Sequence, residues 1–423
     1  MTTPSDITPI DAAAILIVLA AGLAYVNVRF LRLPLTASLT AMGALASLIV
    51  IGVDRLVPGS ELGPAVVRFV DSVDIHATLM DGMLSFLLFA GALHVDWGEM
   101  RRGRWPILAL STVGVVLSTL VVGGGFHVVA SGLGLAVPLA WCLVFGALIS
   151  PTDPVAVIGV LKTADVPATL KATVAGESLF NDGVGVVVFS IMLETALGGS
   201  PFSLGSAAGL FLLEAGGGVA LGLAIGWLAV RAIRSIDEYN VEVLLTLAVV
   251  MGGYALARQL HVSGPVAMAV AGLLIGNHGV RTAMSETTRD YLLKFWSLID
   301  DILNAVLFLL IGLVVVTVPF DVRMIVAGMI AVPLALFARA ISVMLPLAGL
   351  RPFLSLGRLA APILIWGGLR GGISVALALG LPDGPARSSV LTATYIIVLF
   401  SVIIQGGTIG RLLQRLSSAN RAA

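Results

Sequence analysis

Apolar stretches of about 20 residues recur along the whole chain, and this is the length that an α-helix needs to cross a bilayer. Only 11% of the 423 residues are charged, against roughly 25% in a soluble domain. The stretches are rich in Leu, Ala and Gly and lack the two-residue alternation of an outer-membrane strand. The sequence therefore predicts an all-α polytopic membrane protein.

We predict about thirteen transmembrane helices from these stretches, the ninth of them short. Their boundaries are Ile10–Phe30, Leu35–Val53, Ala77–Val95, Pro106–Val129, Pro138–Leu161, Ala172–Ala196, Ala207–Ile233, Val241–Leu260, Gly264–Gly276, Trp296–Val318, Met324–Leu350, Ala361–Leu379 and Val390–Leu413. Most of the 24 Lys and Arg residues fall in loops that follow odd-numbered spans. Because basic loops favour the cytoplasm, we expect the N-terminus outside and the C-terminus in the cytoplasm of a cell (inner) membrane protein.

Overall charge and cysteine content exclude several function classes. The formal net charge is zero, so nothing points to a nucleic-acid partner. Cys142 is the only cysteine, which excludes an internal disulfide framework and a multi-cysteine metal site. We expect no cofactor, and the lipid bilayer as the main surroundings.

Two spans are interrupted at matching places in the chain. If the seventh span is a linker helix (approximately 207–233), spans one to six pair with spans eight to thirteen and enter the membrane from opposite sides. The fifth span is then paired with the twelfth. Ser150–Pro154 carries two prolines that break a helix, and Trp366–Gly372 carries glycines that permit unwinding. Paired broken helices in two inverted six-helix repeats are a pointer to a midplane binding site.

Four polar residues lie inside the sixth span, within Gly176–Gly183. Each ionisable group at this depth costs about 3 kcal/mol on insertion scales, so such groups indicate a functional site. Residues four apart share a helix face, which places Ser178 with Asp182 and Glu177 with Asn181. Hydroxyl and carboxylate oxygens suit a small cation, whereas Glu177 is better placed for pairing. The structural alternative is that both acids only form salt bridges.

Thr152 and Asp153 lie between the two prolines of the fifth span. A break frees carbonyls and exposes half-helix ends that can hold ions. Alternatively, Asp153 caps the second half-helix, and the two interpretations are compatible. Asp300, Asp301 and Asn304, near the start of the tenth span, either line a cytoplasmic entrance or cap that helix.

Two arginines fall inside predicted spans, Arg339 and Arg370. A buried arginine stays charged and needs an acidic partner. If two of the three acids Asp153, Glu177 and Asp182 neutralise them, one carboxylate remains. Burial disfavours its charged form, so that a proton and a cation compete for it.

Several stretches together resemble the bacterial sodium/proton antiporters of the monovalent cation:proton antiporter family, which are relatives of the animal sodium/proton exchangers. They are Phe86–His94, Ser150–Val155, Gly176–Gly183, Ser263–Asn277, Trp296–Gly312 and Trp366–Ala376. The resemblance implies a homodimer with a scaffold (approximately 10–95 and 241–318) and a moving core (approximately 106–196 and 324–413). Within the core, the broken spans five and twelve cross.

The resemblance also implies roles for single residues. Asp182 would be the shared proton and cation carboxylate, and the residues expected to add cation ligands are Asp153, Ser178 and Thr152. Asn181 would brace the broken helices, and Glu177 would pair with Arg339.

The order Asn181–Asp182 looks like that of the electroneutral branch of the family. One position departs from the pattern: relatives often carry an acid where this chain has Ala90.

The leading hypothesis is therefore a secondary active antiporter, not an enzyme, that exchanges Na⁺ (or Li⁺) for H⁺ by alternating access. Exchange of K⁺ for H⁺ is the nearest alternative. An intramembrane aspartyl protease using Asp153 and Asp182 is a remote one, because two buried arginines suit an acid dyad poorly. A passive cation channel is the last alternative.

Overall fold

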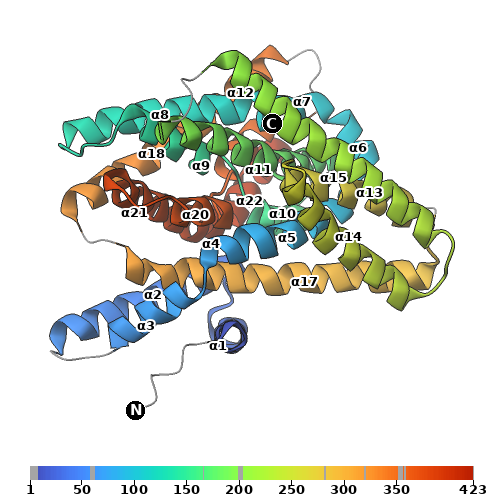
Figure 1. Cartoon of the computed structure of the whole chain (residues 1–423), viewed down its shortest axis with the longest axis horizontal. Helices are drawn as coiled ribbons and strands as arrows, with labels where there is room; N and C mark the ends of the chain where they lie inside the picture. The colour runs from blue at the N-terminus through green and yellow to red at the C-terminus, as the bar shows by residue number, and fades with distance from the viewer. Residues whose placement is uncertain are drawn as a thin grey trace.

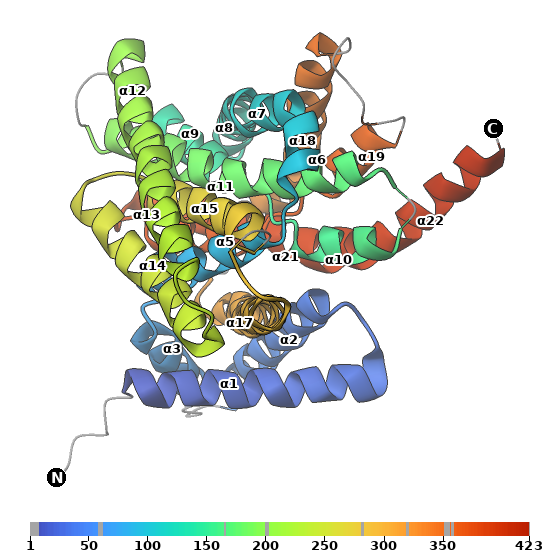
Figure 2. The same ribbon diagram turned by 90° about the vertical axis from the view of Figure 1, so that its right-hand side faces the viewer.

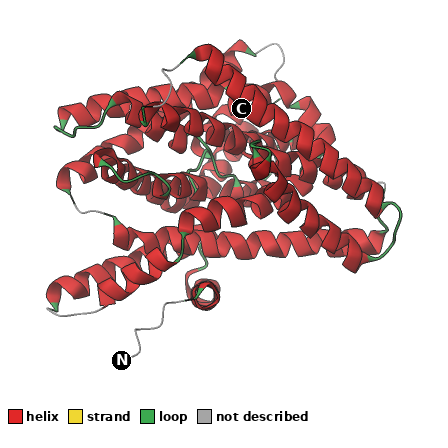
Figure 3. Cartoon of the chain, viewed as in Figure 1, coloured by secondary structure: helices red, strands yellow, loops and turns green. Residues whose placement is uncertain are grey.

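The computed structural model describes residues 8–422, except 58–61, 165, 199–202, 281–282, 319–320, 351–355 and 357–358. Throughout these ranges the regular elements are helices (Figure 3). The first half of the chain forms α1 (Pro9–Val26), α2 (Leu35–Leu56), α3 (Leu62–Ser72), α4 (Ile75–Ala77), α5 (Leu84–Leu93), α6 (Trp97–Arg102), α7 (Arg104–Ser111), α8 (Val113–Gly132), α9 (Leu139–Ile149), α10 (Val155–Thr163) and α11 (Ala168–Ala196). The second half forms α12 (Leu204–Phe211), α13 (Gly217–Ile233), α14 (Tyr239–Gln259), α15 (Gly264–Leu274), α17 (Glu286–Leu313), α18 (Val322–Gly349), α19 (Ala360–Trp366), α20 (Gly372–Leu379), α21 (Pro385–Leu399) and α22 (Gly406–Ala422).

Short tighter or wider turns continue several of these helices. The π-helical turns are η1 (Asn27–Leu31), η2 (Thr78–Met83), η3 (Leu212–Gly216), η4 (Ile275–Gly279) and η7 (Phe400–Gln405), and η5 (Val314–Thr317) is a 3₁₀ turn. In the described part of the chain, 10 helical stretches are long and apolar enough to cross a membrane. These stretches coincide with ten of the predicted spans, so the all-α membrane class is confirmed.

The other three predicted spans are built from shorter pieces. Pro138–Leu161 is divided into α9 and α10, and Ala361–Leu379 into α19 and α20. The short ninth span is α15 continued by η4. Both breaks fall where prolines or glycines predict them.

The start of one long helix and the presence of one short helix differ clearly from the sequence prediction. The tenth span was expected to start at Trp296, but α17 begins at Glu286, where the Ser285 side chain accepts a hydrogen bond from the Thr288 N–H and caps the helix. Polar residues extend the helix here beyond its apolar part, which hydropathy alone does not detect. The 11-residue helix α3 was not predicted, because it is too short to cross a membrane.

Helices from the two halves pack closely against each other in two places. On one side α2 packs against α17, where the Thr40 hydroxyl donates to the Phe308 carbonyl at 2.9 Å. On the other side α5 packs against α15, where a Cβ on Gly272 would lie 2.7 Å from the Phe89 carbonyl oxygen. Under the predicted repeat, spans two and ten correspond to spans nine and three. The two contacts therefore agree with inverted symmetry.

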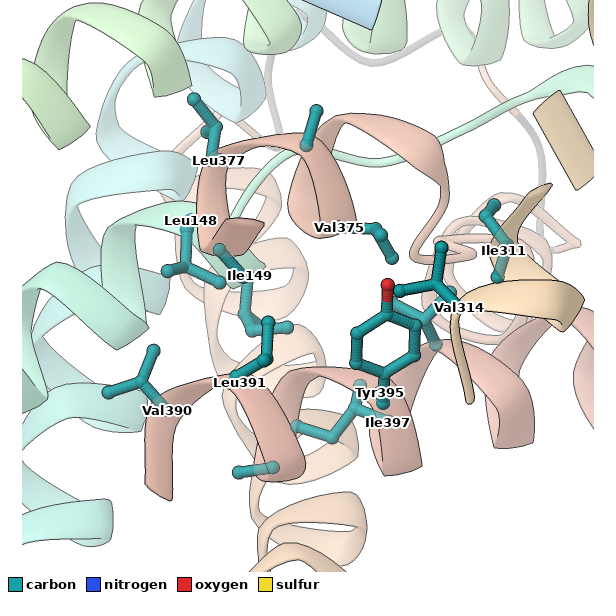
Figure 4. Close-up of a cluster of buried hydrophobic side chains, with 14 of the residues drawn as sticks. Leu148, Ile149, Ile311, Val314, Val375, Leu377, Val390, Leu391, Tyr395 and Ile397 are labelled. Carbon is teal, nitrogen blue, oxygen red and sulfur yellow. The ribbon is translucent and has the colours of Figure 1, made fainter. Parts of the chain in front are cut away.

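Figures 1 and 2 show α1, α2 and α17 together on one side of the molecule, with α7, α8, α9 and α18 on the opposite side. The long helix α11 runs through the second group, and α5 and α15 lie between the groups. Apolar side chains from α9, α20, α21 and α17 meet in one buried cluster beside the broken helices (Figure 4). Tyr395 of α21 lies within this cluster and is 1% exposed. The polar residues described next are therefore held between tightly packed helices.

Candidate functional site

The two broken helices cross at their interruptions. The Asp153 N–H, between α9 and α10, donates to the Leu369 carbonyl, between α19 and α20, at 2.8 Å. This contact is an isolated antiparallel bridge. Backbone groups freed by each break are thus partly satisfied by the other break, as buried backbone groups must be. The predicted crossing of spans five and twelve is present.

Arg370 of the second break contacts the end of α9. Its Nη1 donates to the carbonyls of Ser150 and Pro151, the latter at 3.0 Å. The last carbonyls of a helix carry partial negative charge, so the guanidinium is compensated by the half-helix end. Its Nη2 is buried and makes no hydrogen bond with any residue that the structure describes.

Asp153 of the first break lies at the start of two half-helices. Its Oδ1 accepts a hydrogen bond from the Val155 N–H at the start of α10, at 2.9 Å. Its Oδ2 lies against Gly371 before α20, where an added Cβ would be only 2.4 Å away. Helix N-termini carry partial positive charge that favours a carboxylate. The N-cap position of α10 is Pro154, so Asp153 is not the capping residue itself, although its carboxylate accepts from the first N–H of α10 and stays in the neighbourhood expected for an ion site.

Glu177 of α11 and Arg339 of α18 form a buried, two-pronged ion pair. Arg339 Nη1 and Nη2 donate to the two Glu177 carboxylate oxygens at 2.8 and 3.1 Å. Arg339 Nε donates to the Leu364 carbonyl at 3.0 Å. Gly368 leaves room for the guanidinium, because a Cβ there would lie 2.2 Å from Nε. The pairing implied by the family resemblance is present.

Asn181 connects α11 to the first break. Its Nδ2 donates to Thr152 Oγ1 at 2.7 Å and to Glu177 Oε1 at 2.8 Å, and its Oδ1 accepts from the Thr152 N–H at 3.2 Å. The Ser178 hydroxyl donates to the Thr152 carbonyl. Both polar faces of α11 therefore contact the same interrupted segment.

Asp182 differs from these neighbours. It is 7% exposed and lies one turn after Ser178 on α11, yet it forms no hydrogen bond or ion pair with the part of the chain that the structure describes. The charges of Asp153 and Glu177 both act on it. A carboxylate so placed is unstable as a bare anion.

A narrow cavity without room for a water molecule lies where the first break meets α11 and α18. Its walls include Thr152, Asp153, Ser178 and the Glu177–Arg339 pair. Three of the four expected cation ligands thus line one cavity, whereas Asp182 is not among its lining residues.

The partners of the two buried arginines differ from the sequence prediction. We expected carboxylates to neutralise both arginines and leave a single acid. The structure pairs only Arg339 with a carboxylate, because carbonyls freed by the proline break hold Arg370 instead. In the described part of the chain, Asp153 and Asp182 are therefore both without an arginine partner.

Asp300 is brought close to the site by the helix α17. Its charge acts on Asp153, and its Oδ1 accepts from Asn304 Nδ2 at 3.0 Å. The alternative that Asp300 caps the helix is wrong, since α17 begins at Glu286. Ala90, the position singled out in the sequence, is 1% exposed within α5.

Metal-ligating side chains do not cluster in the described ranges, where no group of three or more His, Cys, Asp or Glu could hold a metal ion. The oxygens near Asp182 are hydroxyl, carbonyl and carboxylate groups, a donor set that suits hard cations.

Comparison with known proteins identifies one family along nearly the whole chain. The family model described as "Sodium/hydrogen exchanger, transmembrane" matches residues 15–415. The Na(+)/H(+) antiporter NhaP of Pseudomonas aeruginosa is 47% identical over 416 residues, 96% of this chain and 97% of that protein. The Na(+)/H(+) antiporter NhaH of Halobacillus dabanensis is 35% identical over 355 residues, 82% of this chain and 86% of that protein.

A solved structure shares the fold. The sodium proton antiporter MjNhaP1 from Methanocaldococcus jannaschii superposes with a TM-score of 0.75 at 20% identity, over 96% of this chain and 98% of that one. Together with the family match over nearly the whole length, this confirms the resemblance seen in the sequence motifs. The chain belongs to the transmembrane sodium/hydrogen exchanger family, whose members are transporters rather than enzymes.

Proposed function

We propose that the protein is a secondary active antiporter that exchanges Na⁺ (or Li⁺) for H⁺, with Asp182 as the carboxylate that both ions share. The observation that carries this proposal is the contrast between two acids of α11. Glu177 is neutralised by Arg339 at 2.8 Å, whereas Asp182, which is also buried, has no such partner in the described residues. The names of the relatives, Na(+)/H(+) antiporters, support the choice of ions.

Sharing one carboxylate couples the two ions. A buried carboxylate must be either protonated or bound to a cation, because the bare charge is too costly. Binding of one ion therefore releases the other. The negative charge of Asp182 is neutralised once in each state, by a proton in one and by a monovalent cation in the other. This favours one-for-one, electroneutral exchange.

Thr152, Ser178 and Asp153 are proposed as the remaining cation ligands. The Thr152 carbonyl accepts from Ser178, and the Thr152 hydroxyl accepts from Asn181 at 2.7 Å. Each of these oxygens keeps a further lone pair for a cation. Asn181 and the Glu177–Arg339 pair would hold α11 in register with the break, as positioning residues.

Alternating access would require the core (approximately 106–196 and 324–413) to move against the scaffold (approximately 10–95 and 241–318), with the linker helix (approximately 207–233) between them. We propose that two copies assemble through the scaffold in the cell (inner) membrane. The N-terminus would lie outside and the C-terminus in the cytoplasm, in accordance with the distribution of basic loops.

The test is exchange in proteoliposomes with a proton-sensitive dye. Asp182→Asn keeps the size of the side chain and removes its charge, so Na⁺-driven proton movement should fall to the level of empty liposomes. Glu194→Gln, on the same helix but exposed, is the matched control and should retain exchange. Exchange by Asp182→Asn at the wild-type rate would refute the shared-carboxylate mechanism.

Two further arms of the same assay separate the alternatives. A series of Na⁺, Li⁺ and K⁺ gradients tests the K⁺/H⁺ alternative, which the names of the relatives do not favour. Clamping the membrane potential should leave the rate unchanged, and a strong dependence on voltage would contradict electroneutrality. Saturable transport that runs uphill on a proton gradient would exclude a passive channel.

A further inference from the structure

The contact between α13 and α15 is close along most of its length and opens at one end. A Cβ on Gly218 would lie 2.6 Å from the Ser263 carbonyl oxygen, and one on Gly222 would lie 2.4 Å from that of Ala267. The next glycine on the same face of α13, Gly226, faces Ala271 and Leu274. Beyond it, larger residues follow on α13, and a cavity of about 760 Å³ lies between the helix ends.

The lining of this cavity is cationic on one side and apolar on the other. Its polar residues are Arg231, Arg234, Ser235 and His278, and its apolar residues include Trp227 and Leu228. Among the described residues no carboxylate lines the cavity, although Asp237 and Glu238 follow closely in the chain. The lining therefore favours an anion.

The order of the residues along α13 indicates the kind of anion. Trp227, Arg231 and Arg234 are spaced by four and three residues and share one helix face. Trp227 and its neighbour Leu228 are 58% and 57% exposed, within the apolar stretch Gly205–Ile233. Tryptophan is enriched at the membrane–water boundary, so the two arginines, one and two turns further on, reach the headgroup level. An apolar wall followed by a forked cation matches an acyl chain followed by a phosphate.

We propose that this cavity is a binding site for an anionic phospholipid. The phosphate would be held by the guanidinium groups of Arg231 and Arg234, with His278 beside it. The acyl chain would lie along Trp227 and Leu228. A free phosphate ion would use the cationic side alone, and a second copy of the chain would need carboxylates to complement it. The proposal is independent of which ions the protein exchanges.

The experiment measures lipid retention by the purified full-length protein with native mass spectrometry. Phosphatidylglycerol is titrated against phosphatidylcholine for the wild type and for Arg231→Gln/Arg234→Gln. We expect the wild type to bind phosphatidylglycerol preferentially and the double variant to bind it at least tenfold more weakly. The matched control is Arg101→Gln/Arg104→Gln, since these exposed arginines also lie at a span end, with Arg104 5.4 Å from the Trp105 ring.

Four results would overturn the proposal. They are equal retention by the wild type and the double variant, an equal loss in the control pair, binding of inorganic phosphate as tight as that of phosphatidylglycerol, and a change confined to the oligomeric state. If the glutamine variant does not fold, Arg231→Lys/Arg234→Lys keeps the charge but loses the forked geometry. An intermediate loss of phosphatidylglycerol would then support the site, and wild-type binding would contradict it.

Discussion

The ion pair between Glu177 and Arg339 gives the most quantitative test of how the core is held together. Both side chains are buried, at 2% and 7% exposure, and the closest N–O distance is 2.8 Å. Removing one partner of a buried pair leaves an uncompensated charge and costs about 3–5 kcal/mol. Removing both partners is far less costly, since no bare charge remains. Arg339→Gln and Glu177→Gln should therefore each destabilise the protein strongly.

A double-mutant cycle separates this effect from general damage. We expect Glu177→Gln/Arg339→Gln to be more stable than the sum of the single changes predicts, by about 3 kcal/mol or more, because each single change leaves a bare buried charge that the double change does not. The measurement is the free energy of unfolding in mixed micelles by SDS titration, followed by circular dichroism. The exposed pair Lys294–Asp290, at 2.6 Å with 69% and 60% exposure, is the control, and its neutralisation should lower the stability far less than a change in the buried pair does.

The result that refutes this reasoning is additivity. If the two single changes at Glu177 and Arg339 add within about 0.5 kcal/mol, the groups do not interact energetically, and the geometry of the pair has no consequence for stability. If neutralising the exposed pair lowered the free energy of unfolding as much as neutralising the buried pair, burial would not be the cause of the destabilisation.

Two further predictions concern close approaches at glycines. Gly371→Ala places a Cβ 2.4 Å from Asp153 Oδ2, so we expect exchange in proteoliposomes to fall at least tenfold, whereas Gly407→Ala, with open space around it, should leave the rate unchanged. Gly312→Ala places a Cβ 2.5 Å from the backbone of α2 and should lower the free energy of unfolding by about 1–3 kcal/mol. Gly91→Ala, with nothing within 4 Å, should be neutral or slightly stabilising. Equal behaviour of each variant and its control would contradict the packing argument.

Much of the architecture could be predicted from the sequence, because hydropathy and helix-breaking residues act locally. The apolar stretches gave the spans, and the prolines of Ser150–Pro154 marked the break between α9 and α10. The polar residues of α11 could be divided into two faces, since helix geometry fixes their spacing. The hydrogen bond from Asn181 to Glu177 at 2.8 Å follows from that spacing.

The partners of Arg370 could not be predicted in this way. Charge counting assumes that a buried arginine finds a carboxylate, whereas the carbonyls of Ser150 and Pro151 take that role. Which alternative occurs depends on the three-dimensional crossing of two breaks more than 200 residues apart in the chain. The available signal was the proline break itself, which frees carbonyls at the end of a half-helix.

The crossing also has a consequence for how the core can move. Each break supplies a charge to a half-helix of the other, Arg370 to the end of α9 and Asp153 to the start of α20. Pulling the breaks apart would separate the buried Arg370 guanidinium from the carbonyls of the first break, at a cost of several kcal/mol, and would take the Asp153 carboxylate away from the start of α20. We therefore expect any change of access to carry both broken helices together with α11, which Asn181 ties to them. Movement would then occur at the contacts around this unit, where apolar surfaces slide without exposing charge.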